Sequence, residues 1–306
     1  MNASFASALT ASHEAAASQH YPQGALYVVA TPIGNLADIT LRALHVLQLV
    51  DVIACEDTRH TQSLLRAYGI ERSSQQLLAL HQHNEAEAAQ GAIARLRAGQ
   101  RIAYVSDAGT PAISDPGARL VAAVQAEGLP VVPLPGASSV TTALSVAGIA
   151  DDDATGFVFV GFLPAKTNER VTAVQALASE YRAVVLLEAP HRIEPLAAAL
   201  AVLGERKLTI GRELTKQFEE IATVPAAEFS TWLAAQANRT RGEFVLVLHP
   251  APVATQAGEA QGLRILELLL AELPLKTAVK LAADISGSSR NALYDAALAM
   301  KQLSKT

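Results

Sequence analysis

Short apolar runs alternate with helix-like patterns along the first half of this chain, and this alternation restricts its fold more than any other feature. Each run has the length of a buried strand and is followed by a turn-rich segment and by apolar residues at helical spacing. Helices placed in this way carry the chain back across a face of the sheet, so successive strands lie parallel. The runs lie at 25–30, 51–55, 77–80, 100–105 and 129–134. The first half therefore predicts a mostly parallel, doubly wound sheet.

The second half continues with strand-like and helix-like patterns. Apolar runs at 157–162, 183–188, 207–211 and 243–248 predict its strands, and helical spacing lies between most of them. Because some intervening strands can pair antiparallel, we expect this half to be an α/β domain with a mixed sheet.

Two segments rich in turn-forming residues divide the chain. One runs from Gly148 to Gly156 with three successive aspartates, and the other, 250–261, is rich in Ala, Pro, Gly and Gln. The N-terminal stretch holds seven alanines and a single acid, Glu14, which indicates a disordered or loosely helical tail. The predicted parts are a flexible tail at 1–23, α/β domains at 24–149 and 155–250, and a helical module at 261–306.

The charge balance limits the partners that the chain can attract through its overall field. The formal net charge is −5 and the pI is about 5.9, whereas a general nucleic-acid-binding domain is basic. Contact with nucleic acid must therefore rest on local patches.

Cys55 is the sole cysteine of the sequence, which excludes a disulfide framework and fits a reducing cytoplasm. No apolar run has the length of a membrane span, and the N-terminus lacks the basic start of a signal peptide, so we expect no membrane partner.

Three turn-rich loops follow predicted strands of the first half. The loop at 106–117 contains Asp107, Asp115, prolines that stiffen it and glycines that let a ligand approach the backbone. The loops at 31–35 and 135–139 lie at the same edge, because the carboxyl ends of parallel strands meet there, and open α/β sheets bind ligands at that edge. No G-x-G-x-x-G or Walker pattern occurs, which removes the main support for a dinucleotide or P-loop site.

Charged residues gather at three further strand ends. The segments Glu56–Arg59, Glu188–Arg192 and Gly211–Gln217 are typical of an active-site rim, since functional side chains concentrate on such loops. His81 and His83 have the spacing of a metal pair. A third ligand is missing from the sequence nearby, so we favour a solvated helix start and expect no metal.

Long motifs at and around these loops occur in one order along the chain. They are Thr31-Pro-Ile-Gly-Asn-Leu-Ala-Asp-Ile-Thr40, Cys55-Glu-Asp-Thr-Arg59, Ser106 to Gly117, Pro133-Leu-Pro-Gly136, Gly161-Phe-Leu-Pro164, Pro190-His-Arg192 and Arg212-Glu-Leu-Thr-Lys216. Together they resemble the tetrapyrrole-methylase superfamily, and within it the branch that methylates ribosomal RNA, over roughly residues 24–306. Corrin and porphyrin relatives carry a G-x-G-P-G-D-type first loop, and its replacement by residues 30–35 favours the RNA branch. The family's usual serine before the second-half proline is Ala189 here, so a hydroxyl at that position is not essential.

The resemblance implies two α/β domains with S-adenosylmethionine (SAM) bound in the cleft between them, followed by the helical module. It implies 2′-O-methylation of a cytidine in 16S ribosomal RNA, at the decoding centre of the small subunit, by a cytoplasmic homodimer. Two alternatives stay open. One is a methyltransferase acting on a small tetrapyrrole, and the other is a non-catalytic RNA-binding factor in ribosome assembly.

The same resemblance carries cofactor-binding positions onto this chain. They lie on the three first-half loops and on the two polar clusters of the second half, and many would act through backbone groups. The implied SAM-binding residues are Pro32, Val105, Ser106, Asp107, Gly109, Thr110, Ser138, Ser139, Glu188 and Leu214.

The chemistry itself calls for a proton acceptor. A ribose 2′-hydroxyl is protonated at neutral pH, and a general base typically contributes about 10²–10⁴-fold. Arginine cannot act as a base and lysine would need a strongly lowered pKa, so Arg59, Arg192, Arg212 and Lys216 are predicted to bind substrate phosphates. The remaining candidate bases are Asp57, Glu213 and His191. The sequence does not rank them, although we expect a carboxylate near the SAM methyl group.

The end of the chain has a helix–turn–helix rhythm over 275–294, with Gly287 at the turn. Six cations face four acids over 261–306, which leaves this segment at 6 − 4 = +2 in an acidic chain. We expect it to contact ribosomal RNA phosphates. The alternative is a packing module that only stabilises a dimer.

Overall fold

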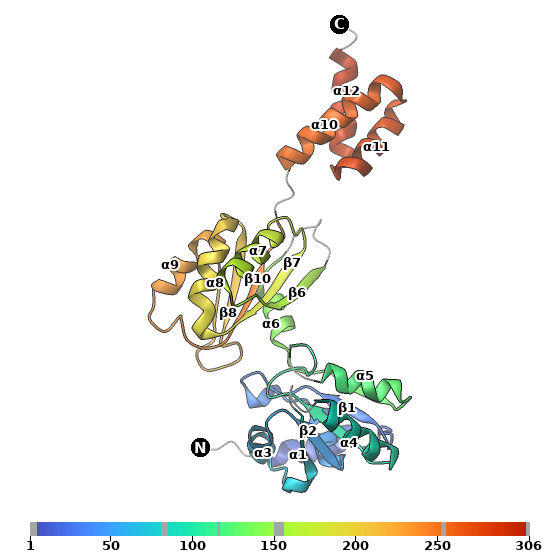
Figure 1. The fold of residues 1–306 in the computed structure, drawn as a ribbon, viewed down its shortest axis with the longest axis vertical. Helices are drawn as coiled ribbons and strands as arrows, with labels where there is room; N and C mark the ends of the chain where they lie inside the picture. The colour runs from blue at the N-terminus through green and yellow to red at the C-terminus, as the bar shows by residue number, and fades with distance from the viewer. Residues whose placement is uncertain (1–4, 81–84, 115–116, 150–155, 252–254, 304–306) are drawn as a thin grey trace.

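The structure, a computed structural model, describes residues 5–80, 85–114, 117–149, 156–251 and 255–303. His81, His83, Asp115 and the three aspartates of the first predicted linker lie outside the described residues. Two α/β domains and a helical C-terminal module follow one another along the chain (Figure 1). The predicted fold class is confirmed.

The first domain is built on a five-stranded sheet with the order β3-β2-β4-β1-β5, and every pairing is parallel. Helices cover both of its faces, as a doubly wound sheet requires. One core cluster lies under α2 and α3, and the other lies under α4 and α5. The strands are β1 (Leu26–Val29), β2 (Val52–Cys55), β3 (Leu77–Ala79), β4 (Ile102–Val105) and β5 (Val131–Leu134). The helices are α2 (Leu41–Leu49), α3 (Thr58–Ala67), α4 (Glu85–Arg97) and α5 (Ala118–Ala126).

The N-terminal segment, predicted to be a disordered or loosely helical tail, contains a packed helix. Residues Ala6–Ala16 form helix α1, which packs along α2. Phe5 and Leu9 lie against the first core cluster, and the Phe5 ring meets the buried Tyr68 ring edge-on at 5.0 Å between centroids. The alanine-rich composition concealed this, because alanine favours a helix without marking which side is buried.

The second domain is built on a five-stranded sheet with the order β6-β7-β10-β8-β9. Its β6–β7 pairing is parallel and the other pairings are antiparallel, which confirms the predicted mixed sheet. Strand β9 was not predicted. The strands are β6 (Phe157–Phe162), β7 (Ala183–Glu188), β8 (Lys207–Arg212), β9 (Glu220–Pro225) and β10 (Phe244–Leu248).

The two faces of the second sheet are covered by helices of different origin. Val184 and Leu246 point to a core beneath α7 (Thr167–Leu177), α8 (Ile193–Leu200) and α9 (Phe229–Ala234). Their neighbours Val185 and Val247 point to the other face, as the two-residue period of a strand requires. That face packs against α6 (Ser139–Val146), the helix that follows the last strand of the first domain.

The C-terminal module consists of α10 (Thr255–Glu272), α11 (Leu275–Ser286) and α12 (Arg290–Leu303) around a core of its own. Gly287 ends α11 in the left-handed conformation, with φ 69°.

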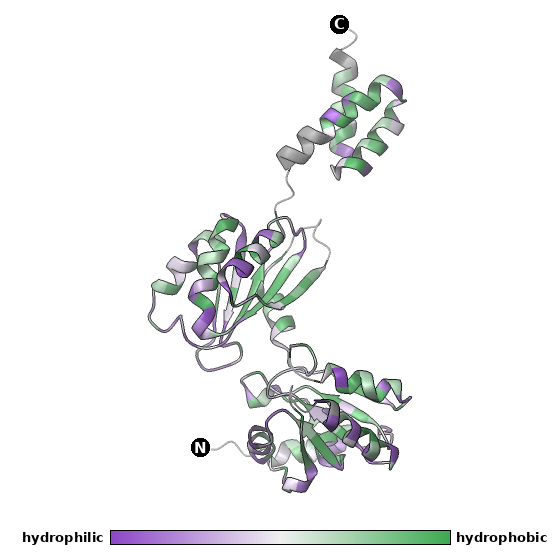
Figure 2. Cartoon of the chain, viewed as in Figure 1, coloured by the Kyte–Doolittle hydropathy of each residue, from purple (hydrophilic) through white to green (hydrophobic). Residues whose placement is uncertain are grey.

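Figure 2 shows the strands of both sheets as mainly hydrophobic and the outer helices as mixed. Short 3₁₀ turns lie at Leu36–Asp38, Ser74–Gln76, Pro190–Arg192, Ala201–Leu203 and Ala226–Glu228. Among the described residues, no helix combines the length and apolarity needed to cross a bilayer.

Candidate active site

The three loops of the first domain meet, as the sequence predicted. Thr31 and Gly109 form an antiparallel bridge, with N···O distances of 2.9 and 3.0 Å. The Thr110 hydroxyl donates to the Ala137 carbonyl at 3.0 Å, which ties the second loop to the third. Gly136 lies so close to Ala30 that a Cβ there would sit 2.8 Å from the alanine methyl. The loops therefore form one surface whose shape depends on their mutual contacts.

A cavity of about 350 Å³ lies between this surface and the second sheet. The second domain contributes the end of β7, the turn after it and the start of β10. Five of the predicted cofactor-binding residues line the cavity: Gly109, Thr110, Ser138, Ser139 and Glu188. The other lining residues are Ile33, Ala108, Ile113, Ser114, Val140, Phe162, Leu187, Ala189, Pro190, Glu243, Phe244 and Val245.

The other five predicted cofactor-binding residues lie behind this lining. Pro32, Val105 and Ser106 are buried, and the Ser106 hydroxyl donates to the carbonyls of residues 108 and 109. Asp107 is half-buried, and its Oδ1 is a buried atom without a hydrogen-bond partner among the described residues. Leu214 is buried against Gly211 in the core between α6 and the second sheet. Four of these residues support the loops from the interior. Asp107 differs, because its Oδ1 can still accept a hydrogen bond.

Glu188 is the most deeply placed charged group of the cavity. Its side chain is fully buried, and Oε1 accepts the Ala189 amide at 3.0 Å and lies 3.0 Å from Arg192 Nε. The Arg192 guanidinium also donates to the Leu163 carbonyl. Oε2 has no hydrogen-bond partner within the described part of the chain. A buried carboxylate oxygen without a donor is costly, so this atom points to a ligand. Arg192 holds this acid, which differs from its predicted contact with a phosphate.

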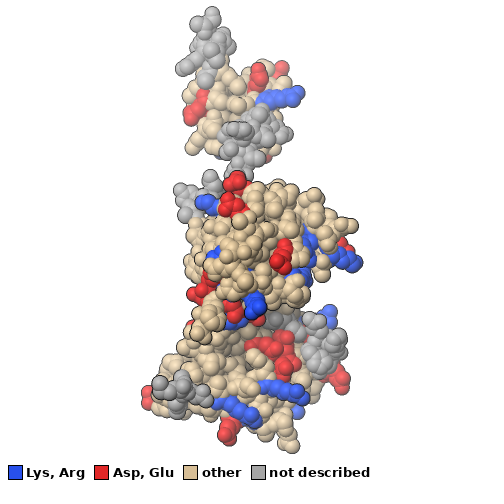
Figure 3. Space-filling model, turned by 90° about the vertical axis from the view of Figure 1, so that its left-hand side faces the viewer, with Lys and Arg blue, Asp and Glu red and all other residues tan. Residues whose placement is uncertain are grey.

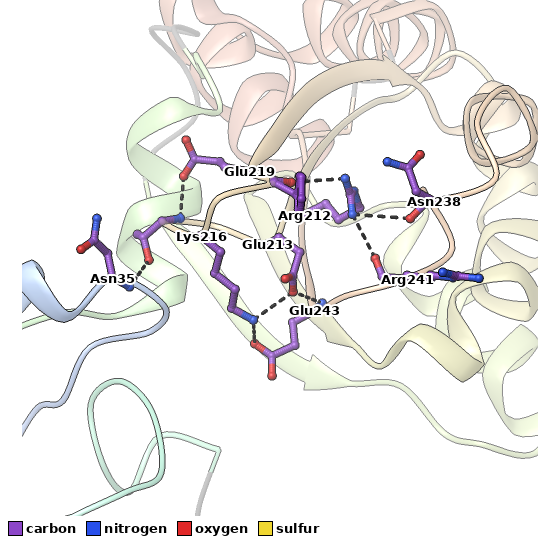
Figure 4. A network of polar contacts seen from close by, with 10 residues as sticks. Asn35, Arg212, Glu213, Lys216, Glu219, Asn238, Arg241 and Glu243 are labelled. Carbon is purple, nitrogen blue, oxygen red and sulfur yellow. Dashed lines mark hydrogen bonds and ion pairs between the residues drawn. The ribbon is translucent and has the colours of Figure 1, made fainter. Parts of the chain in front are cut away.

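A second polar group joins the domains at the segment 213–217 (Figure 4). Lys216 Nζ donates to Glu213 and to Glu243, at 2.9 Å each, and Glu213 also accepts the Glu243 amide at 2.9 Å. Glu213 and Thr215 have positive φ, 50° and 66°, a conformation that non-glycine residues rarely adopt. Such strain persists only where surrounding contacts hold it, and it concentrates at functional sites.

The charges of this group shift one another. Burial opposes ionisation of Glu213, but hydrogen bonds from Lys216 and the Glu243 amide outweigh it, and the pKa of Glu213 is lowered. Burial likewise opposes the charge of Lys216, yet its bonds to Glu213 and Glu243 prevail and its pKa is raised. Both shifts favour the charged forms, so Lys216 stays protonated and Glu213 stays ionised.

Arg212 lies in the interior. It is 5% exposed, and its guanidinium binds Glu220 and the carbonyls of Phe218, Asn238 and Arg241. With all of these contacts internal, it braces the loops after β8 and before β10. The predicted contact of Arg212 with a substrate phosphate finds no exposed surface here.

The remaining predicted residues lie at the surface. Asp57 is the N-cap of α3, and its carboxylate accepts the amides of Arg59 and His60 at 2.7 and 3.2 Å. These two bonds hold the pKa of Asp57 below its usual range. Arg59 is exposed on the first turn of α3, and His191 is exposed beside Pro190, a residue of the cavity wall. Neither Asp57, Glu213 nor His191 lines the cavity.

Glu243 is a charged residue of the cavity that the sequence did not indicate. It lines the cavity and binds Lys216, yet it immediately precedes strand β10, whereas the sequence pattern pointed to the carboxyl ends of strands. Because β10 is antiparallel to β7, with Phe244 opposite Glu188, the start of β10 meets the end of β7 at one edge. Only the strand direction could have revealed it. Among the described residues, no three metal-binding side chains cluster.

Comparison with known proteins places this geometry in a family. The model of the tetrapyrrole (corrin/porphyrin) methylases matches residues 25–230, and that of the RsmI C-terminal HTH domain matches 256–301. A cobalt precorrin-4 methyltransferase structure superposes with a TM-score of 0.55 at 17% identity, covering 76% of this chain and 98% of that one. A Thermus thermophilus uroporphyrin-III C-methyl transferase complexed with S-adenyl homocysteine gives 0.51 at 18%, covering 73% and 96%. These two likenesses establish the fold.

Sequence relatives are much nearer. A ribosomal RNA small subunit methyltransferase I from Escherichia coli O157:H7 is 50% identical over 278 residues, covering 90% of this chain and 95% of that protein. The protein of the same name from Pseudomonas aeruginosa is 49% identical over 279 residues, covering 90% and 97%. One from Neisseria meningitidis serogroup A is 48% identical over 291 residues, covering 94% and 98%. This chain belongs to the tetrapyrrole methylases, and within them to the ribosomal RNA small subunit methyltransferase I family.

Proposed function

We propose that this protein transfers the methyl group of SAM to the 2′-hydroxyl of a cytidine in 16S ribosomal RNA of the small ribosomal subunit. The observation that carries the proposal is the cavity between the two sheets, built from the loops that the family shares and lined by two acids. Relatives that are about half identical over nearly their whole length bear the name of a small-subunit RNA methyltransferase.

The cavity residues fit SAM. The volume of the cavity lies within the range of small-molecule sites. Glu188 suits a positive charge of SAM, on its sulfonium or its amino group, and Thr110 and the two serines offer hydroxyls for polar groups. The unpartnered Oε2 of Glu188 is placed to accept a hydrogen bond from a bound hydroxyl or amine. When bound there, SAM supplies the electrophilic methyl group.

The chain's own residues would then position the ribose and accept its proton. Positioning an attacking oxygen in line supplies much of such a rate. We place the proton acceptor in the carboxylate pair of Glu213 and Glu243, because Lys216 fixes both and Glu243 reaches the cavity wall. Arg59, exposed near the same edge, is the proposed orienting contact to the nucleotide, with Lys216 as the second cation.

The two alternatives rest on less. A cobalt precorrin-4 methyltransferase and a uroporphyrin-III C-methyltransferase share 17% and 20% of their residues with this chain, so they support a common fold alone. A non-catalytic assembly factor would have no need of the buried, unpartnered carboxylate oxygen of Glu188.

The discriminating experiment incubates purified enzyme and methyl-labelled SAM with small subunits, precursor particles and naked 16S RNA in parallel. We expect label on one cytidine ribose, located by mapping the modified 2′-oxygen. Label in a tetrapyrrole and none in RNA would favour the first alternative. Tight RNA binding without transfer would favour the second.

Changing Glu188 should weaken the binding of SAM. Glu188→Gln keeps the shape but removes the charge, and a hydrogen bond to a charged group is worth about 1.5–3 kcal/mol. We expect SAM to bind about tenfold more weakly or worse, measured by isothermal titration calorimetry. Glu194→Gln, the same change on an exposed acid of α8, should leave the affinity unaltered. Equal affinities in the two variants would remove Glu188 from the site.

We also propose that the protein is a cytoplasmic homodimer, as the family resemblance implies. Phe157 and Phe162 on the edge strand β6 are 49% and 52% exposed, an apolar surface that a dimer would bury.

We also propose that the C-terminal module contacts ribosomal RNA. Lys276 and Lys280 are exposed and lie one turn apart on α11, so they share a face. The double variant Lys276→Glu/Lys280→Glu should weaken binding to small subunits and lower the slope of log affinity against log salt by about 1 per lost phosphate contact. SAM affinity should not change. Lys207→Glu, an exposed lysine of the second domain, is the control. Unchanged subunit affinity would leave the module with a packing role only.

A further inference from the structure

A second and larger groove lies beside the cofactor cavity. Its volume is about 1180 Å³, and it is bounded by α1, by the segment after β1, by the end of α3 and by the segment 215–217. Ile33 lines the cavity while Gly34 and Asn35 line the groove. Glu243 lines the cavity while Lys216, bonded to it at 2.9 Å, lines the groove. The two spaces thus share one thin wall.

The shared wall is held in place by contacts between the domains. The Asn35 amide donates to Thr215 Oγ1 at 3.2 Å (Figure 4). Gly34 has no room for a side chain, because a Cβ would sit 2.4 Å from Lys216 Cγ and 3.1 Å from the Leu214 carbonyl. Such closeness fixes the distance between whatever fills the cavity and whatever fills the groove.

The two spaces differ in charge. The groove lining contains two cations, Arg66 and Lys216, and no acid, whereas the cavity lining contains Glu188 and Glu243 and no cation. Glu213 and Glu243 offset the charge of Lys216. Arg66 is exposed and makes no ion pair with any described residue. Figure 3 shows both signs of charge side by side where the two α/β domains meet. In a chain of net charge −5, this separation suits a cationic ligand in one space and an anionic one in the other.

The surface between the cations is mostly apolar. Leu36, Ala37 and Ala67 lie in it, and Phe5 and Leu9 of α1 form one side. A nucleobase has a flat apolar face, and stacking on such surfaces needs no particular sequence. Helix α1 precedes residues 25–230, the segment that the methylase family model matches.

We propose that this groove binds the single-stranded RNA next to the acceptor nucleotide, with Arg66 on a backbone phosphate and a base against Leu36 and Ala37. The proposal rests on the proposed function and names the path of its substrate. It gives Lys216 a position between the strand and the cofactor, where its third N–H can donate to the acceptor nucleotide.

The test compares two arginines in the same setting. Arg66 lies in the last turn of α3, and Arg95, exposed in the last turn of α4, lies on the opposite face of the first sheet. A short fluorescein-labelled single-stranded oligoribonucleotide, followed by fluorescence anisotropy, reports binding by the full-length protein. Arg66→Glu is expected to bind it about tenfold more weakly and to lower the salt slope by about 0.7, since one phosphate contact is lost. Arg66→Gln, which adds no repulsion, should lose about fourfold at 0.15 M salt.

Arg95→Glu changes the net charge equally and should bind as wild type. The affinity for S-adenosylhomocysteine, measured by calorimetry, should be equal in all variants and confirms that they fold.

The same oligonucleotide carrying 4-thiouridine should crosslink to peptides that contain residues 34–37 or 66–69. Equal binding by Arg66→Glu and Arg95→Glu, or crosslinks confined to the C-terminal module, would overturn the proposal. If wild type methylates 16S RNA and Arg66→Glu does so equally well, the groove assignment fails while the proposed function stands. If wild type transfers nothing, the function itself fails.

Discussion

Glu243→Gln is expected to slow single-turnover methyl transfer to the small subunit by about a hundredfold or more, while SAM still binds. An amide cannot accept the proton of the ribose hydroxyl, and a general base contributes about 10²–10⁴-fold, or at least ~2.7 kcal/mol of the barrier. Glu243 lines the cavity and is tied to Lys216. Glu213→Gln should also lower the rate, because Glu213 holds the same lysine and the same stretch of backbone.

Two comparisons separate this assignment from its competitors. Asp57→Asn should transfer methyl groups normally, because Asp57 is occupied as the cap of α3 and asparagine caps helices about as well. His191→Ala tests the exposed histidine beside the cavity. If both glutamine variants keep the full single-turnover rate and His191→Ala abolishes it, the histidine is the base and the carboxylate assignment is wrong.

Gly117→Ala is expected to lower the free energy of unfolding by about 3–4 kcal/mol. Gly117 is the N-cap of α5 and has φ 116°, a conformation that L side chains avoid and that costs them about 1–3 kcal/mol. A Cβ there would lie 2.1 Å from Tyr104 Cε1 and so overlap the edge of a buried ring. Such overpacking costs about 1–3 kcal/mol more. Thermal unfolding should shift down by about 10 °C.

Two other glycines divide this effect into its parts. Gly128 has φ 69° and open space around its Cβ direction, so Gly128→Ala should cost about 1 kcal/mol for the backbone alone. Gly91, inside α4, has nothing within 4 Å of that position, and Gly91→Ala should stabilise by about 0.5–1 kcal/mol. A Gly117→Ala variant no less stable than Gly128→Ala would show that Tyr104 moves aside freely.

The sequence predicted the parallel sheet well, because buried strands, turn loops and helices each leave a pattern in residue order. It also predicted that the loops containing Thr31, Gly109 and Ala137 meet, since parallel strands bring their carboxyl ends together. It missed Glu243 because a strand looks the same in both directions. Strand direction depends on which partner a strand pairs with, and that is a property of the whole sheet.

Charged residues at strand ends were a poorer guide to the ligand-binding surface than the positions of the loops. Arg192 and Arg212 have the chemistry of phosphate ligands, yet one binds Glu188 and the other binds interior carbonyls. A sequence shows that a residue carries charge but not whether the fold encloses it, and an arginine with five donors can brace several loops at once. The packing of the N-terminal helix escaped prediction for a related reason, since Phe5 and Leu9 are recognisable as core residues only once the cluster that contains Tyr68 is in place.

Helix α6 has a consequence for where this protein could be divided. Its Val140 and Ala143 cover a face of the second sheet, although the helix continues directly from the last strand of the first. A cut made between the two sheets at residues 150–155 would take this helix away and leave Val185 and Val247 bare to water. The border between the sheets is therefore not a border between independent folding units. The third loop connects β5 of the first sheet to α6, which packs on the second sheet. A change in the angle between the sheets would therefore alter the shape of the cavity.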